Sequence, residues 1–251
     1  MVRGLLKNRP LWFAAGILIL LVLWQTISLL RGSELLLPGP LPVLRQFTRL
    51  VTNGRFLRSL ADSCFRVFLG MFISIPLGII AGVASGLDRR IASLLKPLFQ
   101  VISATPVMSV ILIAFLWFGQ ERTPVFTSFL VIFPVIAANT TQGILSLDPK
   151  LKELFAVYRL SPKERFFSLY LPGIAPFVLG GLRSGLSLCW KVVVAAEVLI
   201  QPRHALGTGM QAAKSQLETA ELFAWTAGAV IAAALSQLLL SCILAFLRRR
   251  H

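Results

Sequence analysis

The chain alternates between long apolar runs and short polar connections. Six apolar runs, at 11–30, 61–86, 97–118, 124–145, 174–199 and 222–247, are each close to the ~20 residues that a helix needs to cross a membrane. The pattern therefore predicts an all-α, polytopic membrane protein, a bundle of about six transmembrane helices.

The longest polar connection follows the fourth run and has its own helical pattern. Asp148 and Pro149 are typical of an N-cap followed by the first helical position. One apolar face then recurs at helical spacing: Leu151, Leu154, Phe155 and Tyr158. Ser161 and Glu164 have the spacing of a capping box. The connection is therefore predicted to hold two short amphipathic helices with a break near Arg159–Ser161, which suggests a docking element.

The connection between the first and second runs also predicts a surface helix. Val43, Phe47 and Leu50 recur at helical spacing, with Arg45 and Arg49 on the opposite side. Such a helix fits the interface between membrane and water.

Small residues recur every four positions within the second run, as Gly70, Ser74, Gly78, Gly82 and Gly86. In lipid this spacing lets helix backbones approach closely. Similar stripes occur in the fifth run, as Gly173, Gly181 and Gly185, and in the sixth, as Ala224, Gly228, Ala232 and Ser236. The stripes predict helix–helix seams rather than ligand sites. Pro76, Pro106 and Pro134 lie inside runs two to four, either as static kinks or as bends of a pathway that changes shape.

Composition agrees with a membrane protein. Of 251 residues, 56% are hydrophobic and 14% charged, and mean hydropathy is +0.79, which excludes an ordinary soluble domain. The net charge is +15, but the basic residues sit in clusters between apolar runs, so nucleic-acid binding is disfavoured. Fourteen Lys and Arg residues fall in connections on the side of the N-terminus and eight on the other side, which predicts that both termini are cytoplasmic.

The first run begins after Arg3, Lys7 and Arg9 and has no small-residue cleavage site behind it, so we interpret it as a retained anchor. We divide the chain into an anchor helix with an outer interfacial segment, 1–60, and a core, 61–251, that contains the polar connection 148–172. The cysteines lie far apart and predict neither a metal site nor disulfides.

Charges within the apolar runs require partners, because each costs at least ~2.5 kcal/mol in mid-membrane. Asp62 and Arg66 are four residues apart and are predicted to pair. Lys191 is the deepest charge and shares a helix face with Ser184 and Ser187. Glu197 points elsewhere, so we expect this polar stripe to line a water-filled translocation path that attracts a polar or anionic solute.

Catalytic chemistry has little support in the sequence. There is no phosphate-binding loop, so ATP binding by this chain is not expected. His204 and His251 are isolated, which predicts neither a metal site nor a general base. Ser187 and Lys191 have a spacing that leaves an intramembrane hydrolase as the alternative function.

A set of short motifs resembles the permease subunits of binding-protein-dependent ABC importers. Glu153, Ala156, Leu171-Pro172, Pro176 and Gly181-Leu182-Arg183 resemble their cytoplasmic EAA loop. Trp117-Phe118-Gly119, Ala195-Ala196-Glu197 and Gly207-Thr208-Gly209 resemble the branch for nitrate, taurine, sulfonates, bicarbonate or thiamine-precursor pyrimidines. The resemblance covers about Leu37 to the C-terminus. One departure is Arg159, where the family usually has glycine.

The resemblance implies the type I ABC importer permease fold in a bacterial cytoplasmic membrane. Its loop would contact a separate ATPase, which binds ATP and Mg, through Glu153, Leu154, Phe155, Ala156, Tyr158, Arg159, Leu160, Ser161 and Pro162. It further implies a second permease copy, most simply a homodimer, and an extracytoplasmic substrate-binding protein. No cofactor is implied for the chain itself.

Overall fold

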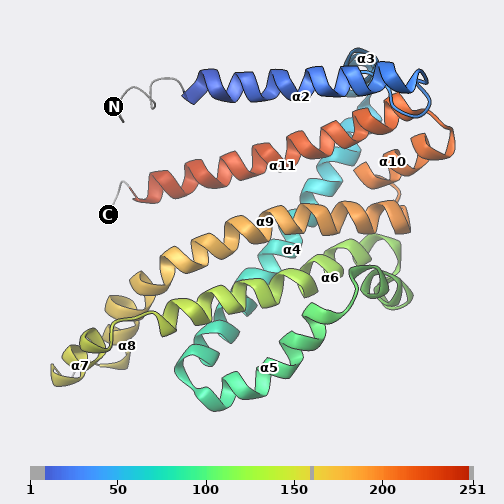
Figure 1. Cartoon of the computed structure of the whole chain (residues 1–251). Helices are drawn as coiled ribbons and strands as arrows, with labels where there is room; N and C mark the ends of the chain where they lie inside the picture. The colour runs from blue at the N-terminus through green and yellow to red at the C-terminus, as the bar shows by residue number, and fades with distance from the viewer. Residues whose placement is uncertain (1–8, 159–160, 249–251) are drawn as a thin grey trace.

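The computed structural model describes residues 9–158 and 161–248, and every regular element in these ranges is a helix (Figure 1). The elements are α2 (Arg9–Arg31), α3 (Pro40–Val51), α4 (Gly54–Leu87), α5 (Arg89–Ala104), α6 (Val107–Leu145), α7 (Pro149–Val157), α8 (Pro162–Arg165), the π-helical turn η1 (Phe166–Tyr170), α9 (Leu171–Ile200), α10 (Leu206–Ser215) and α11 (Thr219–Arg248).

In the described ranges, five helical stretches are long and apolar enough to cross a membrane. They are Leu11–Arg31, Gly54–Leu87, Val107–Leu145, Lys163–Ile200 and Thr219–Ala245. These stretches contain four of the six predicted runs and all but the last two residues of the run at 222–247. The surface helix expected in the first connection is α3, which buries Val43 and Leu50.

The predicted continuous helix at 97–118 is wrong. Its residues are shared between α5 and α6, and the break falls at Thr105 and Pro106. Proline disfavours the helical conformation in the residue before it, and Thr105 is accordingly extended, with φ −72° and ψ 128°. A second break inside α6 occurs at Gly119, whose φ of 70° is accessible mainly to glycine.

The small-residue stripe of α4 forms the main seam of the bundle. A Cβ atom at Gly78 would lie 2.7 Å from Ile136, and one at Gly82 would lie 2.5 Å from Thr140. Gly70 and Gly86 face Ser128 and Ile144 in the same register. The two helices therefore run parallel in close contact, and the predicted seam is confirmed. Parallel neighbours require a return segment between them, which α5 and the first part of α6 provide.

The other small-residue stripes also lie in helix contacts. Gly181 and Gly185 of α9 face Asn139 and Ile132 of α6, an antiparallel register. On α11, Gly228 meets Phe56 of α4. The stripes thus set which helices touch, because lipid offers no hydrophobic drive for their association.

The polar connection partly matches its prediction. The side chain of Asp148 accepts a hydrogen bond from the Lys150 N–H, and Ser161 and Glu164 form the reciprocal capping box. The second helix is not a separate short one, because α8 continues through η1 into α9. The wider π turn comes directly before Pro172, which has no N–H to donate, and it lets the helix pass this residue without a break.

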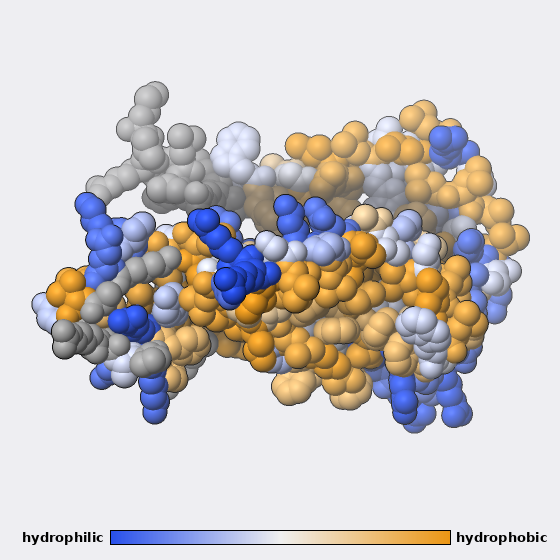
Figure 2. All heavy atoms as spheres, turned by 90° about the horizontal axis from the view of Figure 1, so that it is seen from below, coloured by the Kyte–Doolittle hydropathy of each residue, from blue (hydrophilic) through white to orange (hydrophobic). Residues whose placement is uncertain are grey.

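The first residues of α2 and the last residues of α11 lie at the same end of the molecule as α7 and α8 (Figure 1). Figure 2 shows hydrophobic side chains over the middle of one face, with hydrophilic ones gathered mainly at its two ends and along one edge. This distribution fits a bundle that spans a membrane lengthwise. The division into 1–60 and 61–251 stays a prediction.

Candidate functional site

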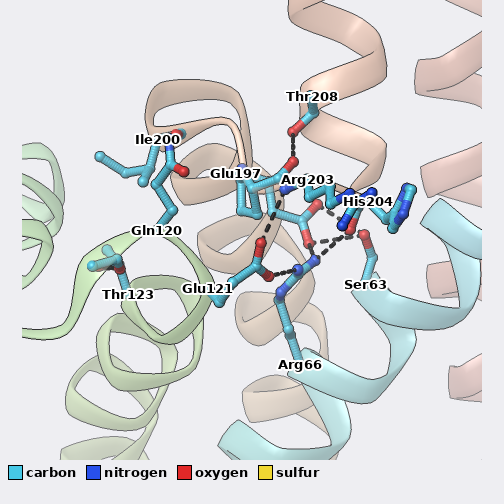
Figure 3. Close-up of polar contacts among 12 residues, drawn as sticks. Ser63, Arg66, Gln120, Glu121, Thr123, Glu197, Ile200, Arg203, His204 and Thr208 are labelled. Carbon is cyan, nitrogen blue, oxygen red and sulfur yellow. Dashed lines mark hydrogen bonds and ion pairs between the residues drawn. The ribbon is translucent and has the colours of Figure 1, made fainter.

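The centre of the polar site is Glu197, near the C-terminal end of α9. Its side chain is fully buried, at 0% exposure, and its carboxylate is surrounded by hydrogen-bond donors (Figure 3). Ser63 of α4 donates to both carboxylate oxygens at 2.8 and 2.9 Å, and the Gly207 N–H donates at 3.2 Å. A carboxylate buried in a membrane helix is tolerated only with such partners.

Arg66 of α4 supplies the balancing charge and joins three further elements. Its Nη1 lies 3.0 Å from Glu197 and donates to the carbonyl oxygen of His204 at 2.9 Å. Its Nη2 pairs with Glu121 of α6 at 2.6 Å. Glu121 in turn accepts a hydrogen bond from the Arg203 N–H at 3.0 Å. The guanidinium thus links α4, α6, α9 and the α9–α10 loop.

The prediction that Arg66 pairs with Asp62 is wrong. Both ion pairs among the described residues belong to Arg66, and their partners are Glu121 and Glu197. Asp62 lies one turn before Arg66 on α4 and lines the cavity beside it, but neither ion pair of Arg66 involves Asp62. The buried Glu197 gives Arg66 a stronger, desolvated partner, so the distant contact forms instead.

The N-terminus of α10 is fitted against α9 at this site. A Cβ atom at Gly207 would collide with the backbone nitrogen of Val198, and one at Gly209 would collide with the ring of Trp225. The Leu206 N–H donates to Ser63 Oγ at 3.0 Å, beside the Gly207 bond to Glu197. The positive end of α10 therefore faces the buried carboxylate, which is a favourable arrangement.

The motifs that carry the branch resemblance meet at this end of the bundle. Glu197, of the motif Ala195-Ala196-Glu197, accepts a hydrogen bond from the N–H of Gly207, of the motif Gly207-Thr208-Gly209. The motif Trp117-Phe118-Gly119 directly precedes Gln120, whose side chain donates a hydrogen bond to the carbonyl oxygen of Ile200 at 3.3 Å. The three motifs, although far apart in the sequence, therefore lie close together in the fold.

A cavity of about 660 Å³ lies beside the network, between α4 and α6. Its charged lining consists of Asp62, Arg66, Glu121 and Arg122, and the remaining lining residues are apolar, among them Phe126 and Phe129. Arg66 is therefore held on one side by buried partners and reaches an open space on the other.

The predicted path residues are only partly brought together. Ser187 and Lys191 both line a groove of about 460 Å³ between α9 and α11. Ser184 is exposed but donates back to the Gly180 carbonyl of its own helix at 3.0 Å, and it is absent from the groove lining. Ser187 Oγ accepts a hydrogen bond from Gln237 at 3.3 Å.

The predicted ATPase-contacting residues that the structure describes lie at the other end of the bundle. Leu154 is 48% exposed and Tyr158 is 70% exposed, whereas Phe155 is half-buried. Glu153 and Ser161 are exposed. Ala156 and Pro162 lie in α7 and α8, with side chains outside the described set, and Arg159 and Leu160 lie outside the described residues.

Sequence reasoning missed Ser63, Glu121 and the true role of Arg66. The available signal was the pair Ser63 and Arg66, which are three residues apart and so share one face of α4 beside the small-residue stripe. Glu121 lies two residues after the break at Gly119, where the chain turns back. Neither observation identifies Glu197 as the partner, because the contact spans 131 residues.

No group of three metal-ligating side chains occurs in the ranges that the structure describes. Ser187 and Lys191 share a groove, but nothing in the geometry or the comparisons supports a hydrolase, since Ser187 is engaged by Gln237.

Residues 74–251 match the family of binding-protein-dependent transport system inner membrane components. The nitrate import permease protein NrtB of Synechocystis sp. is 31% identical over 213 residues, covering 77% of each chain. The taurine transport system permease protein TauC of Escherichia coli is 30% identical over 239 residues, covering 92% of this chain and 86% of that protein.

Solved structures show the same fold at low identity. A bacterial ABC transporter involved in import of the acidic polysaccharide alginate aligns over 99% of both chains, with a TM-score of 0.63 and 14% identity. The family match and the relatives establish that this chain belongs to the binding-protein-dependent transport system inner membrane components and is a multi-pass permease subunit of an ABC importer, not an enzyme, with ATP hydrolysis on a separate subunit.

Proposed function

We propose that this permease imports a small polar or anionic solute across a bacterial cytoplasmic membrane, with both termini in the cytoplasm. A second copy of the chain would complete the path, an extracytoplasmic binding protein would deliver the solute, and ATPase subunits carrying ATP and Mg would drive alternating access. The observation that carries the proposal is the exposed apolar face of α7, at the end of the bundle where α2 begins and α11 ends.

The assignment of sides rests on charge. The basic residues Lys150, Lys163 and Arg165 lie at the α7–α8 end, which also holds the described ends of α2 and α11 (Figure 1). Cytoplasmic connections carry an excess of Lys and Arg. The α7–α8 end therefore faces the cytoplasm, and the network around Glu197 faces outward.

The contact with the ATPase is proposed at the α7 face. Leu151 and Leu154 are exposed on α7, and Tyr158, also exposed, directly follows its last residue, at one end of the bundle. Exposed apolar residues on a polar surface mark interfaces, and an amphipathic helix is suited to a groove on a partner.

The solute class is supported by Lys191 and by the relatives. Lys191 is an exposed cation within a membrane-spanning helix, beside Ser187 in the α9–α11 groove. Relatives are named for nitrate import and for the transport of taurine and bicarbonate. A cation on the path favours solutes of this anionic or zwitterionic kind.

The test is copurification of the tagged full-length chain with its co-expressed ATPase. Leu154→Ala combined with Tyr158→Ala should abolish copurification, because it removes two exposed anchors from one interface. Leu217→Ala is the matched control, since Leu217 is 63% exposed outside α7, in the α10–α11 connection. Full retention of the ATPase by the double variant would show that α7 is not the contact.

A further inference from the structure

A polar cavity of about 430 Å³ lies between α4, α5 and α6. Six of the residues that line it have polar side chains: Ser85, Lys96, Gln100, Ser103, Thr141 and Gln142. Its volume is within the range of about 300–1,000 Å³ that is usual for small-molecule sites. The cavity shares no lining residue with the groove that holds Ser187 and Lys191, so the two are separate places in the molecule.

Helix α5 supplies half of the polar lining from one face. Lys96, Gln100 and Ser103 follow one another at intervals of four and three residues, which places them within about 60° around the helix. Phe99 lies beside them and packs edge-on against Phe133 of α6, with ring centroids 5.5 Å apart. This contact holds the polar face of α5 toward α6, so that its side chains line the cavity.

These polar side chains are not used within the fold. In the described ranges, the side chains of Lys96, Gln100, Ser103 and Gln142 have no hydrogen-bond or ion-pair partner, and both ion pairs there belong to Arg66. Their donors are therefore free to bind a ligand in the cavity between them.

Ser85 is the buried member of the set and points to a ligand independently. It is 8% exposed, and its Oγ is buried without a hydrogen-bond partner in the described part of the chain. Other buried hydroxyls of these helices donate to a carbonyl of their own helix, as Ser74 does to Gly70 at 2.7 Å and Thr140 to Ile136 at 2.8 Å. An unpaired buried hydroxyl costs free energy, so one that lines a cavity indicates an acceptor supplied from outside the chain.

The charge of the lining selects the kind of acceptor. Among the residues that line the cavity, Lys96 is the one charged side chain. Asp88, the nearest acid along the chain, caps α5 by accepting a hydrogen bond from the Arg90 N–H at 2.7 Å. A lining with an ammonium group, hydroxyl and amide donors and no carboxylate fits an anion, because hydrogen bonds to a charged acceptor are the strong ones.

We propose that this cavity binds the oxyanion group of the transported solute, such as nitrate, bicarbonate or a sulfonate, with Lys96 as its counter-ion and Ser85 as its buried hydrogen-bond donor. The inference rests on the anionic class of solute in the proposed function and does not depend on the groove at Lys191. A lipid phosphate has the same chemistry, but Phe99 is the one large apolar side chain in the lining, which leaves an acyl chain little to pack against. Gln142 lies in the last turn of α6, which leads to α7, so the site would hold the solute at the exit side.

The first test measures thermal unfolding of the detergent-solubilised full-length chain without its ATPase, in nitrate, bicarbonate or taurine, at one ionic strength set with chloride. A ligand that binds the folded chain raises its unfolding temperature. At least one of the three solutes should stabilise wild type relative to chloride alone. Lys96→Met and Ser85→Ala should each bind that solute about tenfold more weakly, as expected for the loss of one hydrogen bond to a charged group.

Lys214→Met is the matched control for Lys96→Met, because it removes an exposed cation from α10, outside the cavity. It should bind the solute as wild type does. Lys96→Arg, which keeps the charge, should retain most of the binding.

Ser85→Ala also separates binding from folding. Because its hydroxyl has no partner in the chain, the alanine variant should unfold in chloride at the wild-type temperature or above it, while its stabilisation by the solute falls. Ser74→Ala is the control, since it removes a paired hydroxyl of the same helix. It should unfold at a lower temperature and keep its stabilisation by the solute.

The proposal is overturned if none of the three solutes stabilises wild type, or if wild type and the two cavity variants are stabilised equally. A second arm repeats the measurement in nanodiscs of phosphatidylcholine with and without phosphatidylglycerol. Stabilisation by phosphatidylglycerol that Lys96→Met abolishes, without any by the solutes, would assign the cavity to a lipid headgroup and overturn the solute site. Since the assay needs no ATP, solute binding that Lys96→Met weakens would support this site even if ATP-driven uptake failed and contradicted the proposed function.

Discussion

At the scale of single residues, the buried charge of Glu197 organises the end of the bundle opposite α7. Its carboxylate is neutralised by Arg66, which reaches it from another helix. Removing one partner of a buried ion pair leaves an uncompensated charge and costs about 3–5 kcal/mol.

We therefore expect Arg66→Met to lower the thermal unfolding temperature of the detergent-solubilised chain strongly. Arg122→Met is the control, because Arg122 is exposed and follows Glu121 directly on the same helix. The account predicts little change for the control. If the two variants unfolded at the same temperature, Arg66 would not be holding this end together.

Gly207 is a second residue that its surroundings constrain, because no larger side chain fits at its position. Its Cα faces the backbone of Val198 so closely that a methyl group has no room, and the obstacle is backbone rather than a flexible side chain. We expect Gly207→Ala to push α10 away from Glu197 and to destabilise the chain by roughly 1–3 kcal/mol.

Gly180→Ala is the matched control for Gly207→Ala, since a Cβ at Gly180 has nothing within 4 Å. Alanine is also the better helix former, so this control should be neutral or slightly stabilising. Equal unfolding temperatures for the two variants would contradict the close approach of α10 to α9.

At the scale of elements, α9 carries polar groups toward two different places. Glu197 points into the packed core, whereas Ser187 and Lys191 point into the open groove toward α11. Six residues separate Lys191 from Glu197, which places their side chains about 120° apart around the helix. One helix thus serves both a static network and the proposed path.

Lys191→Met keeps the length and apolar stem of the side chain and removes its charge. We expect solute uptake by reconstituted complexes to fall at least tenfold, with basal ATP hydrolysis retained, because an attractive charge is lost from the path. Lys191→Arg, which keeps the charge, should preserve most uptake. Wild-type uptake by Lys191→Met would remove the support for anion attraction within the membrane.

The elements also show which sequence patterns suffice for prediction. The glycine stripe of α4 predicted a seam because its meaning is local: small residues every four positions leave one flat face. The run at 97–118 was predicted wrongly because hydropathy does not register the break at Thr105 and Pro106. The partner of Arg66 could not be predicted, since pairing across 131 residues depends on the packing of α4 against α9.

At the scale of the whole molecule, the two ends of the bundle have different designs. One end is held together by buried hydrogen bonds around Glu197, and the other carries exposed Leu154 on α7 and exposed Tyr158 just after it. Long helices such as α6 and α9 connect them. If the ATPase binds at α7, as proposed, its movement would tilt these long helices and so open and close the path by rigid-body motion.

The most direct test of this account is solute accumulation in proteoliposomes that contain the chain, its ATPase and its binding protein. The panel is nitrate, bicarbonate and taurine, with ATP supplied on the side of α7. The account predicts accumulation of at least one of these solutes, dependent on both ATP and the binding protein, and its loss in Leu154→Ala with Tyr158→Ala. Accumulation without ATP, or accumulation unchanged in the double variant, would contradict it.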